Sequence, residues 1–206
     1  RKDPFMYRTL VTLFNDGKII DQVEQRLGLR FFTVDHDQGF FLNGEHLQLR
    51  GICLHQDRNE KGNAISHADE DEDVNIILEM GANAVRISHY PHSQYFYDLL
   101  DKNGIVAWSE IPLVGAGDYV TTGYINSGNF RENGKAQLKE MIRQNFNNPA
   151  ICFWGLFNEL KLKGDNPEEY IKELNQLAKT EDPSRLTTAA TYSDDVLTKI
   201  TDLMGW

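Results

Sequence analysis

Segments typical of buried strands alternate with segments typical of amphipathic helices from residue 50 to the end of the chain. This alternation predicts a parallel sheet covered by helices, because parallel strands are joined by long crossovers that are usually helical. A doubly wound sheet and a (β/α)8 barrel both fit, but no glycine-rich phosphate loop follows the first strand, which argues against a dinucleotide-binding fold. We count six strand segments, about two βα units fewer than a full barrel. They are residues 50–55, 84–87, 105–108, 151–157, 186–190 and 202–206.

The helix-like segments carry recognisable start and stop signals. Ser93 suits an N-cap and Gly104 a C-terminal stop, while Asn166-Pro167 followed by two acidic residues is a strong helix start. The predicted helices and their buried residues are 69–80 with Val74, Ile77 and Leu78; 93–104 with Phe96, Leu99 and Leu100; a helix stopping before Pro149 with Leu138, Met141, Ile142 and Phe146; one from 166 with Tyr170, Leu174, Leu177 and Ala178; and a short one at 194–199.

The N-terminal residues have a different texture. Residues 6–34 alternate apolar and polar side chains as strands do, and Asp16-Gly17 between two such runs is a hairpin signal. Residues 29–34 predict a further strand of the same kind. Three strands do not form a stable sandwich alone. We therefore interpret residues 1–34 as the last strands of an all-β sandwich domain, and residues 35–206 as part of an α/β barrel domain.

Polar side chains follow the predicted strands at their C-terminal ends. They are His55 and Asp57, His89, Glu110, Asn158 and Glu159, contributed by several different strands. One polar group from each of several strands at the same end is typical of the (β/α)8, or TIM, barrel, whose active sites lie there. The pattern therefore favours a partial TIM barrel with a site at this end.

Glu159 ends the most apolar strand of the chain, residues 151–157. We expect the neighbouring Phe and Trp side chains to desolvate its carboxyl partly and so to favour the protonated form, as a proton donor requires. The adjacent Asn158 offers a fixed donor and acceptor to a substrate hydroxyl. The alternative is that Glu159 caps the next helix or pairs with Lys161 or Lys163.

The chain is acidic, with 21 Lys plus Arg against 31 Asp plus Glu and a formal net charge of -10. We therefore expect neither nucleic acid nor an anionic membrane surface as a partner. No apolar stretch approaches the roughly 20 residues that cross a bilayer, and no secretion signal is visible. Cys53 and Cys152 lie in apolar strand-like runs without CxxC spacing, so we predict buried, reduced thiols.

Two histidine-containing stretches raise the question of a metal. His89-Tyr90-Pro91-His92 and His55-Gln56-Asp57 both hold ligand-type residues, but no helix aligns them toward a common ion. Histidines on loops more often make hydrogen bonds. The sequence therefore predicts no metal site and no cofactor.

Five motifs resemble glycoside hydrolase family 2, and bacterial β-galactosidases in particular. In chain order they are Phe41-Leu42-Asn43-Gly44 with Leu49-Arg50-Gly51; Leu54-His55-Gln56-Asp57; residues 83–91, NAVRISHYP; Trp108-Ser109-Glu110-Ile111-Pro112; and residues 153–159, FWGLFNE. Residues 1–34 resemble the end of the immunoglobulin-like domain that precedes the barrel in this family.

The resemblance implies a role for each site residue. Glu159 corresponds to the general acid/base and Asn158 to the residue that holds the sugar 2-hydroxyl. Arg86 corresponds to an arginine that orients the nucleophile, His55 and His89 to sugar-contacting residues, and Glu110 to a supporting carboxylate. Trp154 is interpreted as barrel packing. Some relatives bind magnesium shortly after the third strand, but residues 113–116 here (LVGA) hold no suitable ligand, so none is predicted there.

The implied chemistry is retaining, exo-acting hydrolysis of a β-glycoside, which needs a second carboxylate as nucleophile. In this family the nucleophile follows the seventh strand, which places it beyond Trp206. We therefore expect the 206 residues alone to be inactive, with β-galactosidase as the main prediction for the full-length protein and a β-galactoside-containing saccharide as its substrate.

Alternatives stay open at this point. β-Glucuronidase and β-mannosidase share the barrel and the Asn-Glu pair, and a non-catalytic carbohydrate-binding relative would share the fold. An open barrel has bare sheet edges that invite pairing, so a homo-oligomer is also considered. The compartment is open, since a bacterial periplasm and a cytoplasm are both compatible with the sequence.

Overall fold

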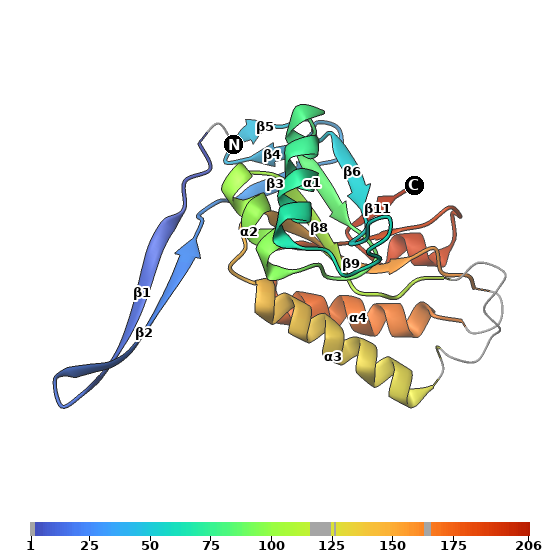
Figure 1. The fold of residues 1–206 in the computed structure, drawn as a ribbon. Coiled ribbons are helices and arrows are strands. Elements are labelled where there is room, and N and C mark those ends of the chain that lie inside the picture. The colour runs from blue at the N-terminus through green and yellow to red at the C-terminus, as the bar shows by residue number, and fades with distance from the viewer. Residues whose placement is uncertain (1–2, 116–124, 126, 163–165) are drawn as a thin grey trace.

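The computed structural model describes residues 3–115, 125, 127–162 and 166–206 of the chain. Its main body is a six-stranded sheet with helices on one face, accompanied by a small three-stranded sheet and by a long hairpin that extends away from the body (Figure 1). The elements are β1 Tyr7–Asn15, β2 Lys18–Leu27, β3 Phe32–Asp35, β4 Gly39–Leu42, β5 Glu45–His46, β6 Gly51–Leu54, α1 His67–Glu79, β7 Ala84–Ile87, α2 Gln94–Asn103, β8 Val106–Glu110, α3 Gly128–Asn145, β9 Ile151–Asn158, α4 Glu168–Glu181, β10 Leu186–Ala190, a 3₁₀ turn Val196–Lys199 and β11 Leu203–Gly205.

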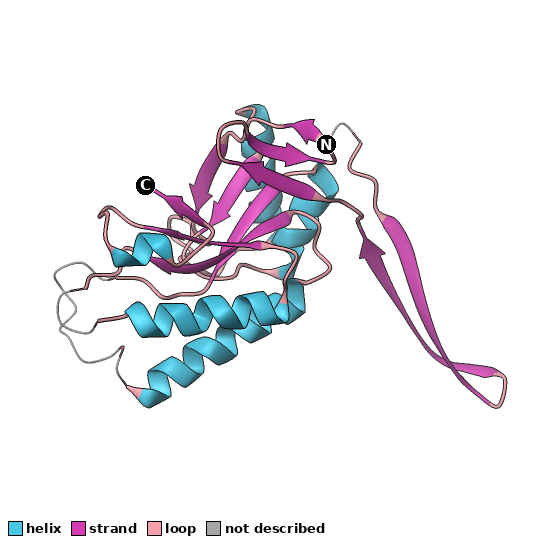
Figure 2. Cartoon of the chain, turned by 180° about the vertical axis from the view of Figure 1, so that it is seen from behind, coloured by secondary structure: helices cyan, strands magenta, loops and turns pink. Residues whose placement is uncertain are grey.

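The six-stranded sheet has the order β11-β10-β9-β8-β7-β6, and every neighbouring pair is parallel. Helices α1 to α4 form successive crossovers on one face, with α1 beside α2 and α3 beside α4 (Figures 1 and 2). Consecutive parallel strands joined by helices on one side are the topology of a (β/α)8 barrel. The predicted six strands and partial barrel are therefore present.

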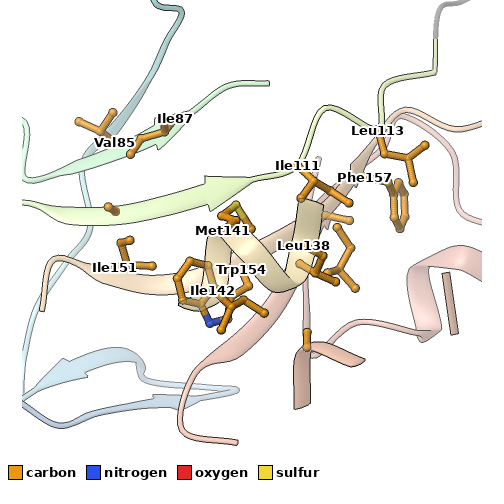
Figure 3. Close-up of a cluster of buried hydrophobic side chains, with 14 of the residues drawn as sticks. Val85, Ile87, Ile111, Leu113, Leu138, Met141, Ile142, Ile151, Trp154 and Phe157 are labelled. Carbon is orange, nitrogen blue, oxygen red and sulfur yellow. The ribbon is translucent and has the colours of Figure 1, made fainter. Parts of the chain in front are cut away.

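Side chains along each strand alternate between the helix-covered face and the opposite face, which we call the open face. Figure 3 shows the helix-covered core, a single buried cluster that includes Val85, Ile87, Ile151 and Trp154 of the sheet and Met141 of α3. Each of these side chains is at most 2% exposed. Full burial of such a side chain contributes roughly 1.5–3 kcal/mol, so this face holds the sheet to its helices.

The open face is apolar at the N-terminal ends of the strands. Phe40 of the small sheet stacks at 5.6 Å on Phe32 and meets Phe153 of β9 edge-on at 5.9 Å. We call this cluster the base layer; its buried members are Phe40, Ala84, Val106, Cys152 and Phe153, and the side chains packed against them include Val34, Leu42, Leu49 and Trp108. The small sheet β3-β4-β5 thus covers the N-terminal end of the open face. The polar side chains lie at the opposite end, where the strands have their C-termini.

Arg185 forms a buried cluster beside the base of the sheet. Its Nη1 donates to Asp182 Oδ2 at 2.7 Å, and its other nitrogens donate to the backbone carbonyls of Phe146, Asn148 and Ile151. Trp154 Nε1 also donates to Asp182 Oδ2, at 2.9 Å. Burial alone would raise the pKa of Asp182, but the hydrogen bonds from Ser184, Arg185 and Trp154 outweigh it and lower the pKa to about 2. We call this group the Arg185 cluster.

The β1–β2 hairpin is antiparallel over its whole length, with Asp16 and Gly17 at positive φ in the turn as the sequence predicts. Most of its apolar side chains are exposed, including Val11 at 63%. Among the described residues, no helix has the length and apolar character needed to cross a membrane.

Several sequence predictions need correction. The strand predicted at 29–34 begins at Phe32 and pairs with β4, so it belongs to the small sheet and not to the hairpin. Leu78 and Phe146 are exposed, because the buried stripes of α1 and α3 are narrower than their apolar patterns. Cys152 is buried as predicted, but Cys53 is exposed, since its neighbours Ile52 and Leu54 take the helix-covered side. The assignment of residues 1–34 to a sandwich domain stays a prediction.

Candidate active site

Arg86 lies at the centre of a polar cluster at the C-terminal end of the open face. Its Nε donates to Glu110 Oε2 at 2.9 Å and its Nη2 to Glu110 Oε1 at 3.1 Å. A two-pronged pairing of this kind fixes the planes of both groups. Glu110 ends β8 and is only 1% exposed, so Arg86 compensates a carboxylate that would otherwise be costly to bury.

His89 and Asn158 complete the cluster. Arg86 Nη2 also donates to Asn158 Oδ1 at 2.8 Å, and His89 Nδ1 lies 2.6 Å from Glu110 Oε1. Both oxygens of Glu110 are therefore engaged, one by Arg86 alone and the other by Arg86 and His89. The structure brings together four residues that the sequence predicts for the site, from three different strands and the loop after β7: Arg86, His89, Glu110 and Asn158. We call them the Arg86 cluster.

A β-bulge in β9 decides which way Asn158 points. Gly155 pairs with Thr188 and Asn158 with Ala190, so three steps along β9 match two along β10. In a regular strand, residues three apart lie on opposite faces. Here the position of Gly155 faces Trp108 and Glu110, and Asn158 also reaches the open face at Arg86. The extra residue therefore re-aims Asn158 into the cluster.

Glu159 follows Asn158 at a backbone φ of 54°, in the left-handed region, and its N–H donates to Ala190 O at 2.7 Å. A Cβ on Gly115 would overlap the Glu159 carbonyl, so the segment after β8 presses against this turn. The side chain is exposed. The expected desolvation by Phe and Trp is therefore absent among the described residues, because Trp154 and Phe157 face the helix-covered core. Helix α4 begins only at Glu168, so Glu159 does not cap it; Lys163 lies outside the described residues.

Two more histidines, His55 and His92, belong to the stretches that the sequence analysis considered for a metal. The exposed ring of His55 meets that of His89 at 5.1 Å and that of Tyr90 at 6.1 Å. His92 is buried against Phe96, and burial lowers its pKa to about 4, opposed by a hydrogen bond with the Ser88 backbone. Among the described residues, no group of three or more His, Cys, Asp or Glu side chains could hold a metal ion. Ala116 of the stretch considered for magnesium lies outside the described residues, so that expectation stays a prediction.

Trp108 is the site residue that sequence reasoning missed. It lies two positions before Glu110 on β8, so both face the open side, and the Arg86 guanidinium lies over its ring at 4.5 Å from the centroid. A Cβ on Gly155 would overlap Nε1 of Trp108. The two-residue spacing from Glu110 was the signal that could have identified it.

A polar cluster at the C-terminal end of a partial (β/α)8 barrel is where enzymes of this fold carry out their chemistry. Residues 33–204 match the family described as "Glycosyl hydrolases family 2, TIM barrel domain". The chain therefore belongs to glycoside hydrolase family 2.

Individual relatives agree with this assignment. The chain is 58% identical, over its whole length, to a β-glucuronidase of Bacteroides fragilis, and 33% identical over 93% of its length to a β-galactosidase of Thermoanaerobacter pseudethanolicus. It spans 30% and 24% of the lengths of these two relatives. Among solved structures, Bacteroides uniformis β-glucuronidase 2, covalently bound to cyclophellitol-6-carboxylate aziridine, matches 98% of this chain with a TM-score of 0.88 and 36% identity, and the match covers 26% of that structure.

Proposed function

We propose that the full-length protein containing this chain is a retaining β-glycosidase, and specifically a β-glucuronidase. The observation that carries the proposal is the Arg86 cluster, which places Asn158 with Glu159 beside it at the C-terminal end of the open face. The proposal concerns the full-length protein, because this chain covers less than a third of the length of each relative compared above.

Glu159 is the proposed general acid/base. It follows directly on Asn158, so the two residues are neighbours at the C-terminal end of β9. Arg86 holds Asn158 by Oδ1, and this fixes the direction of the Nδ2 amide on the other side of the group. Asn158 then offers Nδ2 to a sugar hydroxyl while Glu159 gives its proton to the leaving oxygen. His55 and His89 are proposed to contact the sugar at the rim.

A retaining glycosidase also needs a nucleophilic carboxylate about 5 Å from the acid. Glu110 is a poor candidate, because Arg86 and His89 engage both its oxygens and it is 1% exposed. We assign Glu110 a supporting role, in which it holds Arg86 in place. The nucleophile is proposed to come from another part of the full-length protein.

The proposed sugar differs from the main expectation from sequence, a β-galactoside, and takes up its alternative, a β-glucuronide. The 58% identity to a β-glucuronidase, against 33% to a β-galactosidase, supports a β-glucuronide as the substrate. A glucuronide carries a carboxylate where a galactoside carries a hydroxymethyl group. Its recognition calls for a further cation or amide, because Arg86 is already paired with Glu110 and Asn158 is proposed to bind a sugar hydroxyl. A β-mannoside and a non-catalytic role remain as outcomes of the test.

The test uses the full-length protein with nitrophenyl β-glucuronide, β-galactoside and β-mannoside at equal concentration. We expect the glucuronide to be hydrolysed with the highest kcat/KM. Glu159→Gln should lower turnover of a substrate with a poor leaving group by about 10²–10⁴-fold, and should affect glycosylation from an activated leaving group less. A preference for another sugar would overturn the substrate assignment, and equal loss on both leaving groups would remove Glu159 as the acid.

A further inference from the structure

Trp108 separates the apolar and polar halves of the open face. On one side its ring packs against the base layer, and on the other side the Arg86 guanidinium lies 4.5 Å from its centroid. The two residues are paired neighbours on β8 and β7. A guanidinium over an indole face is attracted by the ring quadrupole, most strongly where water is excluded, and the Arg86 side chain is only 15% exposed.

Space for this ring is provided by glycines on β9, which neighbours β8, and on β11, at the end of the sheet. A Cβ on Gly155 of β9 would overlap Trp108 Nε1, and a Cβ on Gly205 of β11 would lie 3.1 Å from Cη2 and 3.3 Å from Cζ3. The indole therefore extends from β8 across β9 as far as β11. It forms a flat shelf directly beneath the Arg86 cluster.

The indole N–H shows that this placement has a cost. Trp108 Nε1 is buried and has no hydrogen-bond partner among the described residues. An unpaired buried donor is unfavourable, and Trp usually finds an acceptor for its N–H when buried. The Trp108 ring is thus held in place by packing and by its contact with Arg86, and not by a hydrogen bond from Nε1 to a described residue.

We propose that Trp108 is a positioning residue that acts through Arg86. The indole ring fixes the position and the plane of the Arg86 guanidinium. The guanidinium in turn fixes the orientation of the Asn158 amide through its 2.8 Å hydrogen bond to Oδ1. Without the shelf, Arg86 keeps its pairing with Glu110 but can turn away from Asn158. This inference rests on the proposed function, in which Asn158 holds the sugar 2-hydroxyl.

The test compares three variants of the full-length protein. Trp108→Leu removes the aromatic face, whereas Trp108→Phe keeps one six-membered aromatic face and removes the rest of the indole, including the N–H that has no partner among the described residues. Val106→Ala is the matched control, because it removes buried volume from the base layer two residues earlier on the same strand. All three are assayed on a nitrophenyl β-glucuronide and on its 2-deoxy analogue.

We expect Trp108→Leu to lower kcat on the glucuronide by about 10-fold with little change in KM. Trp108→Phe should keep most of the parent kcat. The ratio of kcat/KM between the glucuronide and its 2-deoxy analogue should shrink in Trp108→Leu and stay at the parent value in Val106→Ala. A purely structural Trp108 would leave this ratio unchanged in all three variants, and that result overturns the proposal.

A crystal structure of the full-length Trp108→Leu variant tests the role of Trp108 without an activity measurement. The proposal predicts that the bond from Arg86 Nη2 to Asn158 Oδ1 is lost while Glu110 stays paired. An unmoved guanidinium would overturn the inference. Failure of the unsubstituted protein to hydrolyse any glycoside would instead overturn the proposed function, and this crystal structure would still decide the role of Trp108.

Discussion

Arg185 and Arg86 each lie over a tryptophan ring and each pair with an almost fully buried carboxylate, yet their remaining bonds go to different partners. Arg185 lies 5.3 Å from the centroid of Trp154 and donates to three backbone carbonyls besides Asp182. Arg86 lies 4.5 Å from that of Trp108, and its bonds beyond Glu110 are to side chains, chiefly Asn158. Trp154 Nε1 has an acceptor in Asp182, whereas Trp108 Nε1 has none among the described residues.

The different hydrogen-bond partners of the two arginines indicate different roles: Arg185 acts as a structural clamp, and Arg86 orients side chains of the candidate active site. Backbone carbonyls cannot turn without disrupting the chain, so Arg185 ties the end of α3 and the start of β9 into one rigid unit. Side chains can turn, so Arg86 holds groups whose orientation matters at an edge open to a ligand. Similar chemistry therefore serves stability in one place and orientation in the other.

Arg185→Met should give the largest effect and should act on stability. It leaves Asp182 buried at 0% exposure without its cation, which typically costs about 3–5 kcal/mol of unfolding free energy. Urea unfolding of the full-length protein measures this. The kcat/KM of the folded variant should stay near that of the parent, and a loss below about 1 kcal/mol would contradict the clamp.

Arg86→Met should lower activity in addition to stability, because the buried Glu110 also loses its cation. Asn158 loses the group that orients it, and misplacement of a substrate-positioning group typically costs about 100-fold in rate. The measurement is kcat/KM on the glucuronide, with urea unfolding in parallel. A larger loss of stability than that of Arg185→Met, with activity retained, would remove the distinction between the two clusters.

Acid should loosen the loop beside the Arg86 cluster before it affects the Arg185 cluster. Burial lowers the pKa of His92 to about 4 from 6.5, so as pH falls the unfolded chain takes up this proton before the native chain does. The associated stability is complete above the unfolded value and is lost as pH falls toward about 4, by roughly 2–3 kcal/mol in all.

Asp182 titrates in a lower window. Its pKa is lowered from 3.8 to about 2, so its contribution is lost only as pH falls below 3.8. Hydrogen exchange of the backbone amides around His92, recorded between pH 7 and pH 4.5 and corrected for intrinsic rates, should show the earlier loosening. His92→Phe should abolish that pH dependence; its persistence would assign the effect to another group.

The smallest expected effect is the difference in unfolding free energy between variants that remove the indole N–H of Trp154 and that of Trp108. Trp154→Phe removes a hydrogen bond to the buried Asp182 and should lower the unfolding free energy by about 1–2 kcal/mol beyond the loss of ring volume. Trp108→Phe removes an N–H without a described partner and should cost only the ring volume. Equal losses in urea unfolding would show that Trp108 Nε1 has an acceptor after all.

Much of this architecture could be read from the sequence. Strand and helix periods alternate over the barrel, and the Ser93 cap and the Gly104 stop are local signals that the structure repeats, with the Ser93 side chain accepting from Phe96 N and Gly104 at a φ of 62°. The polar residues His89, Glu110 and Asn158 could be grouped because the C-terminal ends of parallel strands meet at one edge, whereas Arg86 was added by the resemblance to the family. These features depend on nearby sequence or on a single rule of topology.

Features that depend on packing between strands could not be read in this way. The apolar run of β9 looks the same whichever side each residue faces, so its bulge left no trace in the pattern. Trp108 resembles any buried strand residue until Arg86 is placed above it. The exposure of Cys53 and Glu159 likewise depends on which face each residue takes, and an apolar run does not specify that face.

The bulge in β9 has a consequence for how this sequence tolerates deletions. Removing one residue between Gly155 and Asn158, Leu156 for example, would restore an even ladder with β10 and leave the Asn158 side chain on the open face, two positions after Gly155. Most deletions within a buried strand damage the fold and the function together. Here the shortened strand would pair more regularly and its amide would keep its direction, while the helix-covered core would lose one of the two fully buried side chains Leu156 and Phe157. A deletion scan should therefore find at this point variants that lose stability while the orientation of Asn158 is kept. A one-residue deletion would then be selected against at this point through the cell's quality control of folding, and not through a misdirected amide.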